Sequence, residues 1–312
     1  MAATLCAMPA PVTAQSYPDR PIRLVVPFPP GGSSDVSARL LAQQLGERLG
    51  RPIVTENRPG AGTMIGNEIV MRAPADGYTL LYAASSITIT PNINPSLRFD
   101  PRRDLAAISL YIDAPLVLVA NTAVPFQSLT GLVDYAKANP GRLNIAYPGM
   151  GTTNHLAAAL LNHRAGLDIV LVPFAGNAAG LTALMRNDVQ LAVDSLASAT
   201  GFIREGQIRA LGVTGEQRAA SLPDVPAIAE ALPGFETTFW FGLMAPAGTP
   251  QPIIDRLSAE TMAAVREPTV VTRLHDLGFE ARADGPAAFA ARIERDFTKW
   301  GELVRAANIR ID

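Results

Sequence analysis

The sequence predicts an α/β protein of two lobes that are joined by two extended strands. Strand-like and helix-like patterns alternate in the first part of the chain, which is typical of β-α-β units around a largely parallel sheet. A second series with the same layout follows residues 106–121. The length of 312 residues exceeds what a single core usually holds, so two lobes are expected.

The first lobe begins with the buried strand pattern "IRLVVPF" at residues 22–28. A valine and several leucines then recur on one face of a helix that Gly50 ends. The second strand ends near Glu56, and the turn "NRPGAGT" leads into a helix at residues 64–72. The stretch "PADGYTLLYAASS" adds a turn and another buried strand.

The second lobe follows the extended segment "AAISLYIDAPLVLVAN" and alternates helices with strands up to "IRALGVTG". Residues 236–250 form the second extended segment, and we expect only helices after it. Helices without strands of their own must cover a sheet that already exists, so the chain returns to the first lobe. The predicted domains are residues 17–119 with 243–312 for the first lobe, and residues 120–242 for the second. A cleft that can hinge would lie between them.

The composition excludes several classes of function. Hydrophobic residues make up 48% and charged residues 17% of the chain, which is typical of a folded globular protein. A net charge of −2 provides no basic field for nucleic acid or for an anionic membrane. Three histidines and one cysteine, without CxxC or HExxH spacing, predict no metal site, and we expect no cofactor.

The first residues resemble a secretory signal peptide. Residues 1–14 are small, apolar and uncharged and end in a small-x-small pattern, but the basic start is missing. We expect a truncated signal peptide, and the alternative is an ordinary N-terminal tail. Cleavage after Ala14 would remove Cys6, which lacks a lipobox, and leave no cysteine.

Two glycine-containing loops precede helices at the ends of strands, where open α/β sheets bind ligands. In the first, Gly31 and Gly32 allow a close approach to the backbone, and Ser33 and Ser34 add hydroxyl donors. The start of the helix adds unpaired N–H groups and partial positive charge.

The second loop, "YPGMGTTNHL", repeats this arrangement with Gly149, Gly151, Thr152 and Thr153. Two such helix starts that face each other could hold one small anion without lysine or arginine. The loops match neither GxGxxG nor GxxxxGK[ST], although Glu56 lies where a Rossmann acid would bind ribose. Asp35 at the helix start would also repel a pyrophosphate, so a dinucleotide site is not expected.

Other polar residues have a structural and a functional interpretation. We expect Asp35 to cap its helix or brace the loop, and His155 to orient the threonine loop. Asp194 could bind a ligand or fix the neighbouring backbone, and both remain open. A serine nucleophile would need a base, and neither GxSxG nor SxxK is present. The Thr152–His155 pair is the only suggestive neighbourhood for catalysis, so no catalytic residue is predicted.

Several aromatic residues lie near the predicted cleft. Phe28 and Phe174 follow strands at the same edge, where core packing is the default but a ring can also cover ligand carbons. We expect residues 239–241 of the second crossing to belong to the hinge and the core.

Many motifs in order resemble one known family. They include "YPDRPIRLVVPFPPGGSSDVSARLLAQQL", "VTENRPGAGTMIGNEIV", "PADGYTLLYA", "GMGTTNHLAA", "LVPFAGNAAGLTALM" and "FWFGLMAPAGTP". The sequence from about residue 17 to residue 309 resembles the Bordetella uptake gene (Bug) family, the substrate-binding proteins of tripartite tricarboxylate transporters. The resemblance implies a type II periplasmic binding protein fold with a Venus-flytrap cleft.

The resemblance also implies a site for a carboxylated metabolite: a di- or tricarboxylate, an acidic amino acid or an aromatic acid. The carboxylate would lie between residues 28–35 and residues 149–153. A common lysine-glycine pair of the family appears here as Ala175-Gly176, and "AASS" replaces a more glycine-rich version, which leaves the ligand open. The positions that match the family's motifs are Ser33, Ser34, Asp35, Ser85, Thr152, Thr153, Phe174 and Asp194.

The resulting expectation is a monomeric periplasmic protein that captures a carboxylate and passes it to the membrane subunits of a transporter. One alternative is a ligand-dependent partner of a sensor kinase's outer domain. Another is a hydrolase or transferase that uses Thr152 and His155.

Overall fold

The computed structural model describes residues 17–94, 97, 99–307 and 309. The predicted signal peptide, residues 1–14 with Cys6, lies outside the described residues. Among the described residues, no helix has both the length and the apolar character that a membrane span needs.

The first half of the molecule is built on three parallel strands in the order β2-β1-β3. Helix α1 ends at Gly50, whose φ of 68° confirms the predicted glycine stop. Helix α2 also lies where the sequence predicts it. The elements are β1 (Ile22–Val26), α1 (Ser33–Leu49), β2 (Ile53–Asn57), a short 3₁₀ turn (Ala61–Thr63), α2 (Met64–Met71), β3 (Thr79–Ala84), α3 (Ser86–Ile93) and α4 (Pro101–Asp104).

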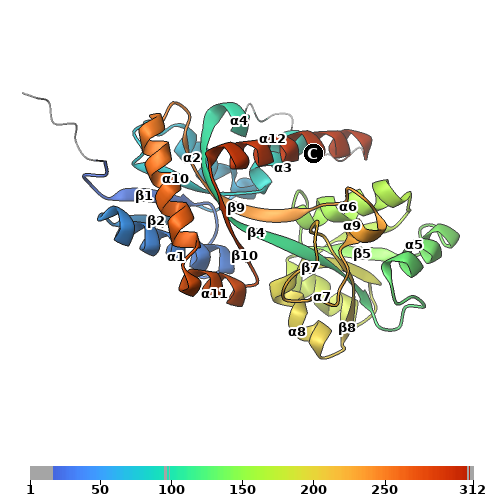
Figure 1. Ribbon diagram of the computed structural model, residues 1–312. Helices are drawn as coiled ribbons and strands as arrows, with labels where there is room; N and C mark the ends of the chain where they lie inside the picture. The colour runs from blue at the N-terminus through green and yellow to red at the C-terminus, as the bar shows by residue number, and fades with distance from the viewer. Residues whose placement is uncertain (1–16, 95–96, 98, 308, 310–312) are drawn as a thin grey trace, which may run out of the picture.

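Two long strands join the halves, as the sequence predicts (Figure 1). Strand β4 (Leu105–Asn121) pairs antiparallel with β9 (Thr238–Pro246), from Leu105↔Pro246 to Pro115↔Thr238. Beyond this pairing, β4 continues into the second half and pairs there with β7 and β8. One strand therefore belongs to both sheets.

The second half repeats the layout with the parallel strands β7-β5-β6. Helices α6, α7 and α8 each begin shortly after a strand ends, which brings their N-termini to one edge of the sheet. The elements are α5 (Leu129–Ala138), β5 (Asn144–Tyr147), α6 (Thr153–Ala165), β6 (Val170–Pro173), α7 (Asn177–Met185), β7 (Leu191–Ser195), α8 (Leu196–Arg204), β8 (Ile208–Val213) and α9 (Ile228–Ala231).

The last part of the chain contains a strand, and the expectation of helices alone was wrong. Strand β10 (Glu280–Asp284) pairs antiparallel with β4, with Glu280 opposite Asp113. Its sequence, EARAD, is charged and carries only alanines as apolar residues, so it gives no hydrophobic strand signal. The pairing comes from the neighbouring strand rather than from the segment's own pattern. The helices here are α10 (Gln251–Val265), α11 (Pro268–Asp276) and α12 (Pro286–Ala306).

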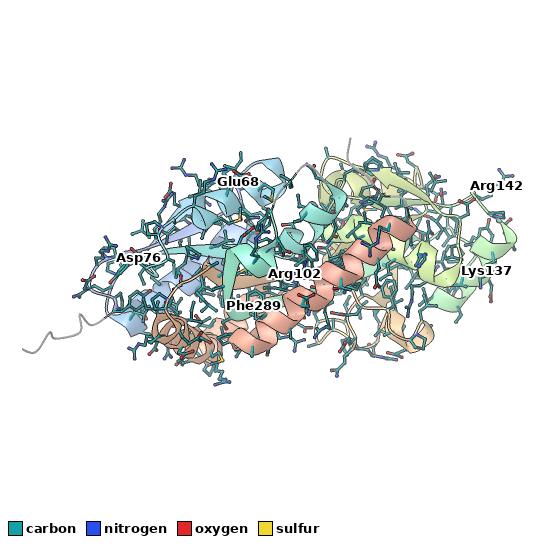
Figure 2. All side chains as sticks on the ribbon, turned by 90° about the horizontal axis from the view of Figure 1, so that it is seen from above. Glu68, Asp76, Arg102, Lys137, Arg142 and Phe289 are labelled. Carbon is teal, nitrogen blue, oxygen red and sulfur yellow. The ribbon has the colours of Figure 1, made fainter. Side chains whose placement is uncertain are left out.

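Helix α12 lies along both halves and contacts α3 in the first and α6 in the second (Figure 1). Viewed from above, Phe289 and Arg102 lie along this helix, whereas Asp76 and Arg142 lie at opposite outer ends of the molecule (Figure 2). Phe289 is fully buried and packs edge-to-face on Trp240 of β9 at 5.1 Å. The crossing strand and the last helix therefore share a core.

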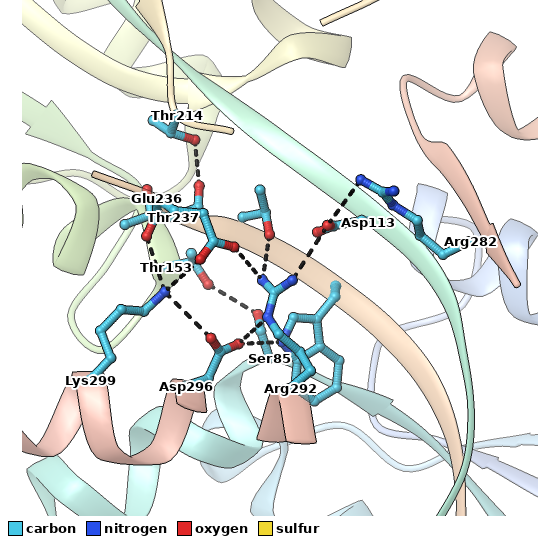
Figure 3. A network of polar contacts seen from close by, with 12 residues as sticks. Ser85, Asp113, Thr153, Thr214, Glu236, Thr237, Arg282, Arg292, Asp296 and Lys299 are labelled. Carbon is cyan, nitrogen blue, oxygen red and sulfur yellow. Dashed lines mark hydrogen bonds and ion pairs between the residues drawn. The ribbon is translucent and has the colours of Figure 1, made fainter. Parts of the chain in front are cut away.

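A buried polar cluster also ties α12 to the crossing strands, and we call it the Arg292 cluster: Asp113, Glu236, Thr238, Arg292 and Asp296 (Figure 3). The Arg292 guanidinium donates to Asp296 at 2.9 Å and to the Thr238 hydroxyl at 2.6 Å. It also pairs with Glu236 at 3.1 Å and with Asp113 at 3.5 Å. Burial disfavours this charge, but the surrounding carboxylates outweigh burial and raise the pKa of Arg292.

Replacement of Arg292 by methionine should destabilise the protein strongly, because Asp113 and Asp296 would lose the buried cation between them and keep only contacts to the more exposed Arg282 and Lys299. We expect the free energy of unfolding to fall by about 3–5 kcal/mol in denaturant titrations. The matched control is Arg72→Met, at a side chain that is 80% exposed and pairs with Glu68 along α2. That change should cost less than about 1 kcal/mol. Equal losses in the two variants would contradict this account of the cluster.

Candidate functional site

A cleft of about 820 Å³ lies between the two halves of the molecule. Its wall comes from the loop after β1, the residues around the starts of α2 and α3, and the crossing strands. The second half supplies the starts of α6, α7 and α8. The cleft therefore lies where the carboxyl ends of both sheets' parallel strands meet, as expected for open α/β sheets.

The first-half loop contributes Phe28 and Ser34 to the wall. Asp35 is buried behind this loop and accepts hydrogen bonds from the Gly31 N–H and from Arg39, both at 2.9 Å, and from Asn57 at 2.8 Å. Burial opposes the charge on Asp35, but these donors outweigh burial and lower its pKa. Gly31 has a φ of 87°, which favours glycine. Asp35 therefore braces the loop rather than facing the cleft.

The second-half loop contributes Gly151, Thr152 and Thr153. Thr152 caps α6, because its hydroxyl accepts from the His155 N–H at 3.2 Å and donates to the Gly149 carbonyl at 2.8 Å. His155 Nδ1 accepts from the Gly151 N–H at 3.3 Å, and the ring stacks on Tyr147 at 4.5 Å. Burial lowers the pKa of His155 to about 4. The histidine therefore orients the loop and forms no proton relay with Thr152.

A hydrogen bond between described residues crosses the cleft between the halves. The hydroxyls of Ser85, at the end of β3, and Thr153, at the start of α6, lie 3.1 Å apart (Figure 3). Ser86, the first residue of α3, in turn contacts the Thr63 hydroxyl at 3.0 Å. Both pairs place side-chain hydroxyls in the wall of the cleft.

Asp194 lies one layer behind the wall. Its Oδ1 accepts from Asn177 at 2.5 Å, from the Ser195 N–H at 2.6 Å and from the Ser198 hydroxyl. Burial raises the pKa of Asp194 to about 6, against these stabilising hydrogen bonds. Asn177 and Ser195, which Asp194 holds, do face the cleft. Of the two roles that the sequence leaves open, the geometry favours positioning the neighbouring groups.

The cleft wall contains part of the predicted set, and the ligand roles of all of these residues stay predictions. The predicted residues in the wall are Phe28, Ser34, Ser85, Gly151, Thr152 and Thr153. Those that lie outside it are Gly31, Gly32, Asp35, Gly149, Phe174 and Asp194. The side chain of Ser33 is not among the described parts of the structure. The polar residues of the wall that sequence reasoning missed are Thr63, Ser86, Thr90, Asn94, Asn154, Asn177 and Ser195.

These omissions have an identifiable cause. Most of the missed residues in the first half belong to α3 or to its contacts, and α3 has the sequence SITITPNI. β-branched residues and Pro91 inside the helix hide it from propensity and periodicity. Ser85, which follows β3, was the only residue in this stretch whose position indicated the ligand edge. In the second half, Asn177 begins α7 and Ser195 ends β7, so both lie where the chain passes from a strand to a helix, which is the same signal that identified Thr152.

Aromatic rings form an apolar part of the wall. Phe28 packs edge-to-face on Phe241 at 5.5 Å, and Phe239 does the same at 5.3 Å. Phe239 and Phe241 line the cleft, whereas Trp240 between them is fully buried in the core. The expectation of core packing is confirmed for Trp240 and for Phe241, which are both buried in the core, and Phe239 packs against the core. Both phenylalanines also line the cleft, and the hinge role of residues 239–241 stays a prediction.

The electrostatic character of the cleft comes from helix ends. None of the described residues in its wall is Asp, Glu, Lys, Arg or His. Six helices, α1, α2, α3, α6, α7 and α8, place an N-cap or first-turn residue there. Each N-terminus carries unpaired N–H groups and partial positive charge, which suit an anion.

Comparison with known proteins agrees with this geometry. Residues 37–309 match the model of the family described as "Tripartite tricarboxylate transporter family receptor". The chain belongs to this receptor family. A curated relative is BugT of Bordetella pertussis, 35% identical over 305 residues, which cover 97% of this chain and 94% of BugT.

Two solved structures of similar proteins contain carboxylates. Rpa4515 of R. palustris "with adipate" is 32% identical with a TM-score of 0.79, and the match covers 94% of this receptor and 99% of that chain. MatC of Rhodopseudomonas palustris "with bound malate" is 33% identical with a TM-score of 0.75, and the match covers 92% of this receptor and 100% of that chain. The fold of this receptor is that of the periplasmic solute-binding proteins, and its family and structural neighbours are binding proteins rather than enzymes.

The depressed pKa of His155 predicts a pH dependence of stability. A histidine of the unfolded chain, with a pKa of about 6.5, binds more protons than folded His155 between about pH 4 and 6.5, so acidification across this window favours unfolding. The free energy of unfolding of the wild type, relative to that of His155→Gln, should fall by about 2–3 kcal/mol from pH 7 to pH 4.

The measurement is the free energy of unfolding at each pH, taken as the difference between the two proteins. The difference is needed because Asp194, with its pKa raised to about 6, titrates in the same window. His163→Gln, at an exposed position later in α6, is the control and should keep the wild-type profile. A pH-independent difference for His155→Gln would show that the folded histidine titrates normally.

Proposed function

We propose that this receptor captures a small organic acid in the cleft between its halves, in the periplasm, and delivers it to the membrane subunits of a tripartite tricarboxylate transporter. The observation that carries the proposal is the combination of an uncharged wall with the N-termini of six helices. Such a wall binds a carboxylate through backbone N–H groups, hydroxyls and helix dipoles, with no fixed counter-ion.

The relatives support this assignment at the level of ligand class. Two similar structures contain adipate and malate, both of which are carboxylates. Among the predicted residues, Phe28, Ser34, Ser85, Gly151, Thr152 and Thr153 are proposed to contact the ligand, and Asp35 and Asp194 to shape the loops that do. The family's description as a transporter receptor and the signal-like start of the sequence support the periplasmic role.

Ligand binding is proposed to close the cleft in the manner of a Venus flytrap, with lobe 1 at residues 17–119 and 243–312 and lobe 2 at residues 120–242. The halves are joined through β4 and β9, and across the cleft they touch through the hydroxyls of Ser85 and Thr153. A carboxylate at this point would contact donors from both halves at once. Binding would then favour the closed state, because only that state brings both sets of donors to the ligand.

Isothermal titration of the purified protein with aliphatic, amino and aromatic carboxylic acids tests the proposal. For an acid that binds, Thr153→Val should weaken the affinity by about 10–100-fold, because a hydrogen bond to a charged group contributes about 1.5–3 kcal/mol. Thr182→Val makes the same change on an exposed face of α7, where the hydroxyl donates only to the Ala178 carbonyl, and should bind like the wild type.

Two results would contradict the proposal. The absence of binding by every acid in the panel would remove the ligand class. An acid that binds equally well to Thr153→Val and to the wild type would place the ligand away from the point where the two halves meet.

A further inference from the structure

We infer that this cleft selects acids that have one or two carboxylates on an uncharged, largely apolar body, and that it discriminates against ligands with an ammonium group. The inference rests on the proposed function and concerns the part of the ligand beyond the carboxylate. The inference follows from the lack of charged side chains among the described residues of the wall and from the wall's apolar surface.

The sign of the electrostatic field in the cleft follows from the groups in its wall. An ammonium group that enters the cleft loses hydration, and a paired carboxylate offsets this loss best. The described wall contains no acidic side chain, and six helices place an N-terminal residue there. One helix, α3, also places its C-terminal end in the wall, at Ile93 and Asn94, so N-terminal ends outnumber C-terminal ends there. The partial charge of an N-terminus attracts a carboxylate and repels an ammonium. The same wall therefore favours one end of an amino acid and opposes the other.

Two carboxylates lie close to the wall, and both are committed to donors of the protein. Asp35 is committed to Gly31, Arg39 and Asn57, and it does not line the cleft. Asp194 is 2% exposed, and its Oδ1 is engaged by Asn177, by the Ser195 N–H and by Ser198. Asn177 and Ser195 stand between this carboxyl and the ligand space. Neither acid is placed to receive an ammonium.

The wall also has an apolar part. Phe28, Phe239 and Phe241 meet edge-to-face, and Ile93 and Leu116 continue the surface from α3 and β4. Methylene groups or an aromatic ring would be buried here at a gain of roughly 25 cal/mol per Å² of apolar area. A charged or strongly hydrated body would lose this gain.

Matched pairs of ligands isolate the ammonium group. Adipate and L-2-aminoadipate share a carbon skeleton, as do 3-phenylpropionate and L-phenylalanine. In calorimetric titrations at pH 7, we expect the plain acid of a pair that binds to bind at least tenfold more tightly than its amino counterpart. An amino acid that binds as tightly as its plain partner, or more tightly, would overturn this inference while leaving the proposed function intact. Silence of every acid would overturn both.

A variant with an added charge tests the physical cause. Ser86 is the first residue of α3 and lines the cleft, so Ser86→Asp places a carboxylate in the wall where an acidic residue also suits the helix dipole. Adipate should bind this variant at least tenfold more weakly, and the ratio of adipate to 2-aminoadipate affinity should fall. The control Ser86→Asn introduces a side chain of nearly the same volume as aspartate but without the charge. This variant should still bind the plain acid more tightly than the amino acid. Equal ratios in both variants would show that charge in the wall does not set the selection.

Discussion

The antiparallel pairing of β4 with β9 is the constraint on which the arrangement of the molecule depends. These strands carry the chain between the halves, and their ladder runs from Leu105↔Pro246 to Pro115↔Thr238. Past this point β4 leaves β9 and joins β7 and β8, so the two sheets separate at the end of the ladder. Leu116, the next residue of β4, lines the cleft. The cleft therefore opens where the shared pairing ends.

The same strands connect the cleft to the Arg292 cluster. Asp113 belongs to the cluster and lies three positions before Leu116 on β4. The Leu116 N–H donates to the Thr214 hydroxyl at 2.8 Å, and that hydroxyl donates to the carbonyl of Thr237, next to Glu236 and Thr238 of the cluster (Figure 3). Polar contacts, joined by short pieces of backbone, thus connect α12 through both crossing segments to a residue of the wall. Movement of one half must rearrange this chain or carry it along as a unit.

The sequence predicts the alternating elements, the two crossings and the two glycine-containing loops, because each has a local signal. Buried strands are apolar runs, Gly50 stops α1, and Thr152 precedes a helix directly after a strand. It does not predict β10, whose charged sequence pairs only because β4 is already in place. It also misses α3, where Pro91 and β-branched residues mask a helix that tertiary packing holds. Local signals fail where neighbouring elements decide the conformation.

The acidic residues of the site show why residue type alone could not assign their roles. Asp35 lies in the first turn of the helix after β1, and Asp194 lies near the end of β7, so both are at the ligand edge, which is the position expected of ligand-binding groups. Each instead accepts several hydrogen bonds and holds the neighbouring chain in place: Asp35 engages the Gly31 N–H, and Asp194 engages Asn177 and the Ser195 N–H. Carboxylates placed behind the donors fix their orientation without presenting a negative charge to the ligand. An anion site built from neutral groups needs such support, because hydroxyls, amides and loop N–H groups must already be aligned before the ligand arrives.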